Sequence, residues 1–130
     1  HQIQAVPILD QTNLEIISTG YILIESGNET AVEKVSQTKP LPRNNSDYVL
    51  QTAKAGVYIG NKLIYLEAGS GAQFPVPTNM IAQVSKGISL PLIVGGGIRS
   101  QSEIQAAYDA GADMVVIGTA FENNLDFFNS

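Results

Sequence analysis

Residues 62–72 read KLIYLEAGSGA, an apolar run that ends in one acidic residue and then in a glycine-rich turn. The apolar part, residues 62–66, shows no alternation with polar residues, which is typical of a strand buried on both faces of a parallel sheet. Similar short runs are YILI at residues 21–24, PLIV at 91–94 and MVVI at 114–117. The sequence therefore predicts four buried parallel strands.

Helical patterns lie between these runs. One helix is predicted over residues 46–58 with Ser46 as its N-cap, and another over residues 77–86 with Pro77 as its first residue. A third helix is predicted to begin at Ser100-Gln101-Ser102-Glu103, which has the spacing of a capping box, and to stop at Gly111. Strand and helix thus alternate, which indicates an α/β fold with right-handed crossovers.

Two further segments are less regular. A helix is expected within residues 5–13, and the polar stretch 25–45 is expected to be a long irregular connection of the kind that often carries function. A complete (βα)8 barrel needs roughly 200 residues or more. If the fold is such a barrel, the 130 residues of this chain are about half of one.

Composition narrows the possible functions. With 44% hydrophobic and 15% charged residues the chain is globular, and its net charge of −5 without a basic cluster disfavours duplex nucleic acid as a partner. A small phosphorylated ligand is compatible with this charge, because backbone amides can hold phosphate without many lysines. Cysteine is absent, which excludes disulfides and thiolate chemistry. No transmembrane run or signal peptide is found, so a cytoplasmic enzyme is expected.

Glycines follow each of the last three predicted strands. They occur at residues 67–71 (EAGSG), 95–97 (GGG) and 118–119 (GT). Ligands of parallel α/β folds bind where strands end, and exposed amides there, with the hydroxyls of Ser70 and Thr119 and a helix N-terminus, would form an anion cradle. The alternative is that these glycines only shape tight turns.

Glu67 directly follows a buried strand, so its carboxylate should point into the mouth of the fold. It is a candidate general base or hydroxyl-orienting group, and the alternative is a salt bridge to a cation at the rim. Tyr65 shares its face and could bind the ligand or belong to the core, as could Tyr21. Arg99 could meet a phosphate or be an exposed rim residue.

Other charged residues carry less information. Lys39 and Arg43 in the long connection are expected to be solvated. The sequence contains no convincing metal-ligand cluster.

Several of these stretches resemble one family. Similarity to motifs of the geranylgeranylglyceryl-phosphate synthases and the related heptaprenylglyceryl-phosphate synthases is seen in YLEAGSGA at residues 65–72 with PVP at 75–77, in PLIVGGGIRS at 91–100 and in AGADMVVIGT at 110–119. TGYIL at 19–23 and KPLPR at 39–43 also fit. The likeness extends from about residue 14 to 122. The motif sequences are more similar to those of the geranylgeranyl branch than to those of the heptaprenyl branch.

The resemblance implies that residues 1–130 form the C-terminal half of a single (βα)8 TIM-barrel domain, supplying about the last four βα units. It implies a Mg2+-dependent prenyltransferase of ether-lipid synthesis that joins sn-glycerol 1-phosphate to geranylgeranyl diphosphate or a related polyprenyl diphosphate and releases diphosphate, acting as a homo-oligomer. Glu67 is implied to bind the glycerol hydroxyls and help remove the proton from the attacking one. The implied glycerol 1-phosphate site comprises Tyr65, Leu66, Glu67, Ala68, Gly69, Ser70, Gly71, Gly96, Gly97, Gly118 and Thr119.

One departure limits the likeness. The family's Mg2+ ligands come from its first two strands, which this chain lacks, so no metal ligand is expected among these 130 residues. The alternatives are a half-barrel that binds phosphate without catalysis and another phosphate-binding TIM-barrel isomerase. The YLEAGSGA stretch argues against the isomerase, and Glu67 argues against a pure binding fragment.

Overall fold

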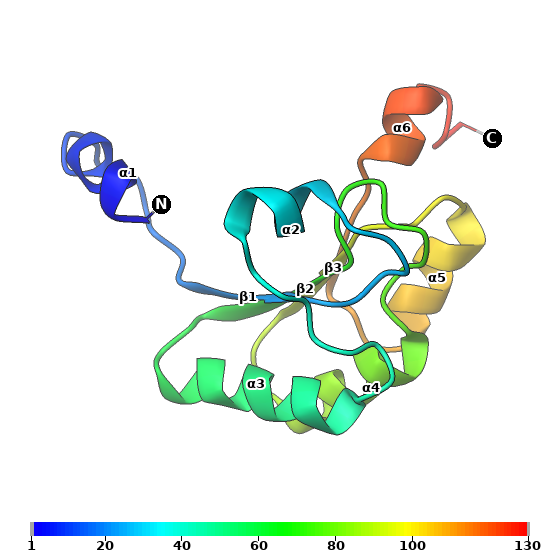
Figure 1. Cartoon of the computed structure of the whole chain (residues 1–130), viewed down its shortest axis with the longest axis horizontal. Coiled ribbons are helices and arrows are strands. Elements are labelled where there is room, and N and C mark those ends of the chain that lie inside the picture. The colour runs from blue at the N-terminus through cyan, green and yellow to red at the C-terminus, as the bar shows by residue number, and fades with distance from the viewer. Residues whose placement is uncertain (1, 130) are drawn as a thin grey trace.

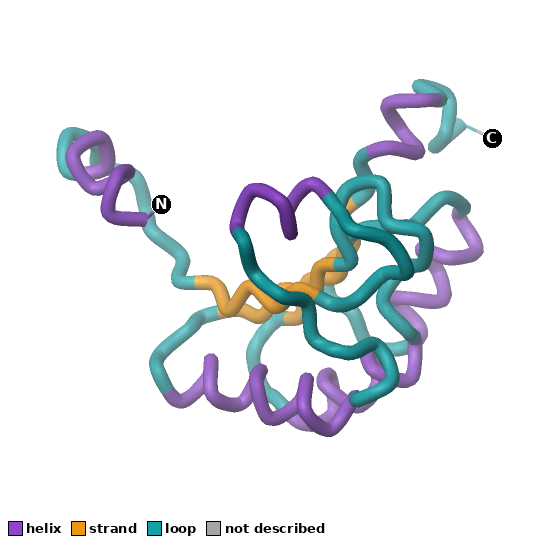
Figure 2. The backbone as a smooth tube through the Cα atoms, viewed as in Figure 1, coloured by secondary structure: helices purple, strands orange, loops and turns teal. Residues whose placement is uncertain are grey.

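The computed structural model describes residues 2–129, and its centre is a four-stranded parallel sheet (Figures 1 and 2). The strands pair in chain order, each with the next. This confirms the predicted alternation of parallel strands and helices. The strands are β1 (Thr19–Leu23), β2 (Leu63–Glu67), β3 (Leu92–Gly95) and β4 (Met114–Val116).

Three helices cover one face of this sheet, namely α3 (Ser46–Tyr58), α4 (Thr78–Gly87) and α5 (Gln101–Asp109) (Figure 1). Their apolar stripes pack against the alternate strand residues that point toward them, which is the arrangement a buried parallel sheet requires. The core is formed by Ile22, Ile24, Val49, Ala53, Ile64, Leu66, Met80, Ile81, Val84, Leu92, Val94 and Ala107.

The first residues of α3, α4 and α5 can be compared with the helix caps that the sequence predicts. The capping box of α5 is confirmed, because the Ser100 hydroxyl accepts from the Glu103 amide at 3.2 Å and the Glu103 carboxylate accepts from the Ser100 amide at 3.1 Å. The N-cap of α3 is wrong by one residue, since Asn45 accepts from the Tyr48 amide and Ser46 is already helical. Pro77 likewise precedes α4 as its N-cap.

Three short helices depart from the predictions. The first, α1 (Gln2–Leu9), begins before the expected 5–13 segment and lies apart from the sheet at the end of an extended stretch (Figure 1). The polar stretch 25–45 is not wholly irregular, because it contains α2 (Ala31–Ser36). The last, α6 (Thr119–Asn123), was not predicted. Neither α2 nor α6 buries a residue, so neither leaves an apolar stripe in the sequence.

The second face of the sheet carries the remaining strand side chains. Parallel register aligns Tyr21 with Tyr65, Ile93 and Met114, and these point away from α3, α4 and α5. Several side chains on this face are open to solvent: Tyr21 is 50% exposed, Met114 54% and Val116 41%. The sheet is thus packed on its helical face and largely bare on the other.

The bare face and the two strand edges at β1 and β4 should make residues 1–130 self-associate when they are produced alone. Exposed strand edges and apolar surface both favour association. Light scattering of the purified 130-residue chain should show oligomers or aggregate. Met114→Lys should raise the monomer fraction, because it places a charge on this face.

Ile59→Lys is the matched control for that experiment. Ile59 is 82% exposed but lies beyond the end of α3, off the bare face, so its replacement should leave the association unchanged. A monodisperse wild-type monomer with a sharp cooperative melt would contradict the prediction.

Candidate functional site

The loops that follow β2, β3 and β4 meet at one edge of the sheet and together line a pocket. The sequence places a glycine cluster in each of these loops, and the structure brings all three clusters together. The pocket is lined by Glu67, Gly69, Ser70, Gly71, Ala72, Gly96, Gly97, Ile98, Arg99, Val116, Ile117, Gly118 and Thr119. The binding role of these residues stays a prediction.

The glycines of the first two loops allow close approach of one chain segment to another. Gly96 has a φ of +86°, and a Cβ there would lie 2.5 Å from both Glu67 Oε1 and the Gly69 nitrogen. A Cβ on Gly97 would lie 2.8 Å from the backbone of Phe74. Side chains at these positions would therefore push the loops apart. Gly118 differs, because a Cβ there would meet no protein atom within 4 Å.

Hydrogen-bond donors remain available around this pocket. Within residues 2–129, no protein acceptor contacts the amides of Ser70, Gly71 or Gly97. Ser70 and Thr119, which carry hydroxyl groups, belong to the same lining, and Arg99 is the one cationic residue among the described residues that form it. Amides grouped in turns of positive φ form concave anion sites. This arrangement of donors is of the kind that holds a phosphate group without a lysine.

Glu67 lies at the end of β2 with 8% of its surface exposed. Its Oε1 atom accepts a 2.7 Å hydrogen bond from the Gly69 amide. Among residues 2–129 the one ion pair within 4.0 Å joins Lys34 and Glu29 on the surface. Among the described residues Glu67 therefore does not form the salt bridge of the alternative prediction. This nearly buried carboxylate lines the pocket without an ion-pair partner within 4.0 Å.

Two tyrosines flank that carboxylate. The rings of Tyr21 and Tyr65 are 5.1 Å apart in an edge-to-face arrangement. Burial and, after it, interaction with the Glu67 carboxylate raise the pKa of Tyr21 to about 12, and the same causes raise the pKa of Tyr65 further above its usual range. Both phenols thus keep their protons at neutral pH and present hydroxyl donors beside Glu67.

Two predicted site residues cannot reach a ligand with their side chains. Leu66 and Ala68 are fully buried in the core on the helical side of the sheet. Only their backbone could contact a molecule in the pocket. Tyr65 is half-buried on the opposite face, next to Glu67, and does not line the pocket itself.

The arginines have roles that the sequence did not indicate. Arg99 lines the pocket but donates to backbone carbonyls, including those of Gln73 at 3.1 Å and Gly97 at 3.2 Å. Arg43 was expected to be solvated, and this is wrong. It donates to the carbonyls of Glu25 and Pro75, and its guanidinium lies 5.2 Å from the centre of the Phe74 ring.

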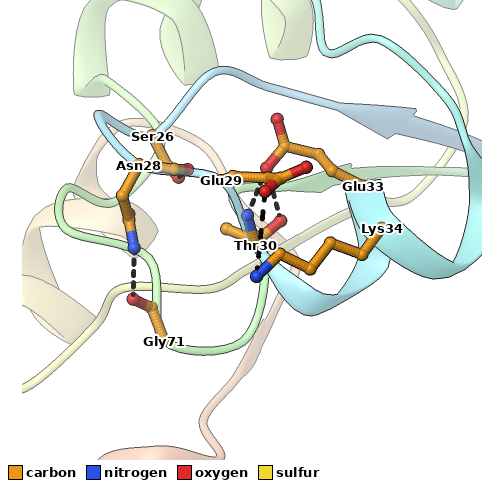
Figure 3. Close-up of polar contacts among 7 residues, drawn as sticks. All are labelled: Ser26, Asn28, Glu29, Thr30, Glu33, Lys34 and Gly71. Carbon is orange, nitrogen blue, oxygen red and sulfur yellow. Dashed lines mark hydrogen bonds and ion pairs between the residues drawn. The ribbon is translucent and has the colours of Figure 1, made fainter.

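The connection before α2 also reaches the site (Figure 3). The sequence indicated the stretch 25–45 as one that often carries function, but it did not indicate Asn28 or Thr30 within it. Asn28 donates to the Gly71 carbonyl at 3.4 Å and accepts from the Gln73 amide at 2.9 Å. Thr30 packs so tightly against Gly69 that a Cβ on this glycine would lie 2.5 Å from its hydroxyl oxygen. The Thr30–Glu33 spacing of a capping box was the available signal.

Neither a metal site nor a membrane span is found in the described part of the chain. Residues 2–129 contain no group of three or more histidines, cysteines, aspartates or glutamates that could hold a metal ion. None of the helices within 2–129 is long and apolar enough to cross a bilayer.

Comparison with known proteins gives consistent matches. A model of the PcrB family matches residues 1–129. The whole chain is 64% identical to 54% of the geranylgeranylglyceryl phosphate synthase of Flavobacterium johnsoniae, and 85% of it is 51% identical to 43% of the synthase of Pyrococcus furiosus. The chain spans about half the length of the curated relatives it matches.

Solved structures agree with these matches. The crystal structure of (S)-3-O-geranylgeranylglyceryl phosphate synthase from Thermoplasma acidophilum, in complex with its substrate sn-glycerol-1-phosphate, superposes with a TM-score of 0.91 at 35% identity. The match covers 99% of this chain and 51% of that one. The enzyme from Thermoplasma volcanium gives a TM-score of 0.89 at 36% identity, again over half of its length.

Alkaline titration should detect the pairing of Glu67 with the two phenols. The raised pKa values mean that the folded protein holds these protons more tightly than the unfolded chain. The resulting stabilisation is complete below pH 10 and is lost as the pH rises through the folded values, about 12 for Tyr21. In Glu67→Gln, the pKa of Tyr21 should fall toward 10, although only in part because burial remains.

Tyrosinate absorbance in the ultraviolet measures this change, with Tyr21→Phe to assign the signal. Glu29→Gln removes an exposed carboxylate and should leave the titration curve unaltered. An identical curve for Glu67→Gln and wild type would contradict the pairing.

Proposed function

The chain belongs to the PcrB family, and from this we propose that it supplies the glycerol-phosphate half of a prenyltransferase. The proposed reaction joins sn-glycerol 1-phosphate to geranylgeranyl diphosphate or a related polyprenyl diphosphate and releases diphosphate. The fold is that of half a (βα)8 TIM barrel. The observation that carries the proposal is the carboxylate of Glu67, which has no ion-pair partner among the described residues. It lines a pocket that glycine-containing loops form at the ends of the strands.

Substrate binding follows from the donors and acceptors around the pocket. The amides of Ser70, Gly71 and Gly97, with the Ser70 and Thr119 hydroxyls, would hold the phosphate group. The glycerol hydroxyls would then lie toward Glu67, which is on the same lining. Fixing the phosphate at one end orients the hydroxyl at the other, which lowers the entropic part of the barrier.

The proposed chemical step needs a proton acceptor at Glu67. The glycerol hydroxyl oxygen attacks the first carbon of the prenyl chain, a C–O bond forms, and the bond from that carbon to diphosphate breaks. An alcohol does not ionise at neutral pH, so its proton must pass to a base as the new bond forms. We propose the Glu67 carboxylate as the acceptor, since it accepts the Gly69 amide at Oε1, lies beside the Tyr21 and Tyr65 phenols and lines the pocket.

The remaining parts of the activity lie outside these residues. We propose that the activity depends on Mg2+, held by residues in the part of the relatives' length that this chain does not span. Residues 2–129 contain no group of three or more histidines, cysteines, aspartates or glutamates that could hold the ion. The polyprenyl diphosphate site, assembly as a homo-oligomer and a cytoplasmic location are parts of the same proposal. The relatives' names support prenyl transfer over an isomerase or a binding-only module.

Removing the proposed base should slow catalysis while leaving the protein folded. In the full-length enzyme, Glu67→Gln keeps the size and the hydrogen-bonding oxygen of the side chain. We expect kcat to fall by roughly 10²-fold or more, the usual scale of general-base catalysis. Steady-state assays of diphosphate release measure the change. Glu15→Gln, which replaces an exposed carboxylate, is the control and should leave kcat unchanged. A folded Glu67→Gln enzyme with the kcat of the wild type would show that Glu67 is not the base.

Narrowing the pocket should weaken glycerol-phosphate binding selectively. Gly96→Ala introduces a methyl group 2.5 Å from Glu67 Oε1 and the Gly69 nitrogen, so the loops must separate. The KM for sn-glycerol 1-phosphate should rise by about tenfold or more, equivalent to roughly 1.4 kcal/mol of lost binding, while the KM for prenyl diphosphate changes little.

Gly60→Ala is the matched control for the pocket variant. Gly60 also has a positive φ, +94°, but a Cβ there meets nothing within 4 Å and the residue lies at the opposite end of β2. It should lower stability through backbone strain without changing either KM. Equal effects of the two substitutions on KM would mean that Gly96 acts through stability alone.

A further inference from the structure

The guanidinium of Arg99 joins two of the loops that form the pocket. It donates to the Gln73 and Ala72 carbonyls in the loop after β2, and to the Gly97 carbonyl in the loop after β3. The two loops are in direct contact at this point, because a Cβ on Gly97 would lie 2.8 Å from Phe74 C and Pro75 N. The fork of donors on one arginine thus ties together the backbone of two glycine loops.

The same segment, residues 71–75, is held from two other directions. Asn28 binds the Gly71 carbonyl and the Gln73 amide, and the Ser26 carbonyl accepts from the Phe74 amide at 3.0 Å. At the far end, Arg43 binds the Pro75 carbonyl at 3.3 Å and covers the Phe74 ring. Side chains from three separate connections therefore converge on five consecutive residues.

This bonding separates the loop into a fixed part and an open part. Carbonyls at 71, 72, 73 and 75 and the amides at 73 and 74 have partners inside the protein. The amides of Ser70 and Gly71 have no such partner within residues 2–129. The fixed part immediately follows the open part, so it sets where the two free amides lie.

We propose that Arg99, supported by Arg43, is a positioning residue that holds the free amides of Ser70 and Gly71 ready for the phosphate of the substrate. The inference rests on the proposed glycerol-phosphate site. It assigns Arg99 to the loop backbone and not to direct ion pairing with the phosphate. Preorganised donors bind an anion more tightly than donors that must first be ordered.

Binding of the loop backbone by Arg99 and direct ion pairing with the phosphate predict different effects of a lysine at position 99. A lysine keeps the positive charge at the pocket but lacks the planar fork that reaches three carbonyls in two loops. In the full-length enzyme, Arg99→Lys and Arg99→Gln should therefore both raise the KM for sn-glycerol 1-phosphate by roughly tenfold, the scale of losing a charged hydrogen bond. The KM for prenyl diphosphate should stay within about twofold. If Arg99→Lys binds glycerol phosphate as wild type does, the charge is what matters and the positioning role is overturned.

Hydrogen exchange tests the loop itself and does not depend on activity. In the unliganded wild-type enzyme, the Gln73 and Phe74 amides should exchange slowly and those of Ser70 and Gly71 fast. Arg99→Lys and Arg43→Lys should each speed exchange at Gln73 and Phe74. Lys39→Gln changes an exposed cation in the connection that also carries Arg43 and should have no effect.

The two experiments separate this inference from the function on which it rests. Absence of glycerol-phosphate binding in the wild type, with the predicted exchange pattern present, would refute the proposed function and leave the loop fixed by arginine. Fast exchange at Gln73 and Phe74 in the wild type would overturn the positioning role even if the enzyme is active. Should Arg99→Lys fail to fold, Arg99→Gln is measured in its place, and exchange at Gln73 and Phe74 as slow in that variant as in the wild type would overturn the positioning role.

Discussion

A carboxylate held nearly out of water without a cation is the constraint around which this site is built. Burial of an unpaired charge is costly unless hydrogen bonds and polar neighbours compensate for lost water. Glu67 receives the Gly69 amide on one oxygen and has two phenols beside it. Glycines at 95 and 96 leave room for it, because a Cβ at either position would press on its oxygens. The tyrosines, the glycines and the end of β2 therefore all serve to accommodate the buried carboxylate of Glu67.

Much of the fold could be predicted from short-range patterns. Apolar runs without alternation predict buried parallel strands, and the capping box at Ser100 places the start of α5. The glycine clusters and Glu67 were identifiable because they lie at the ends of strands or just after them, where backbone direction alone determines which edge of the sheet they reach. These are local signals, and in each case the structure puts the residues at the predicted edge.

Features that depend on distant partners could not be predicted in this way. Arg43 is a polar residue in a polar stretch, and nothing near it in sequence shows that Pro75 and Phe74 lie beside it. Asn28 likewise contacts Gly71 and Gln73, more than forty positions away. Short helices such as α2 and α6 bury no residue and so leave no periodic pattern. The missed residues are those whose role is to hold one loop against another.

The convergence of three connections on residues 71–75 also limits how this region can change during evolution. An insertion or deletion in any one of the connections before α2, α3 or α5 would displace a side chain that bonds to a specific carbonyl or amide of the same five residues. Loops in α/β proteins usually vary freely in length because they touch little else. Here the lengths of four loops are coupled, so a graft that transplants one of them into another barrel would need to carry the other three.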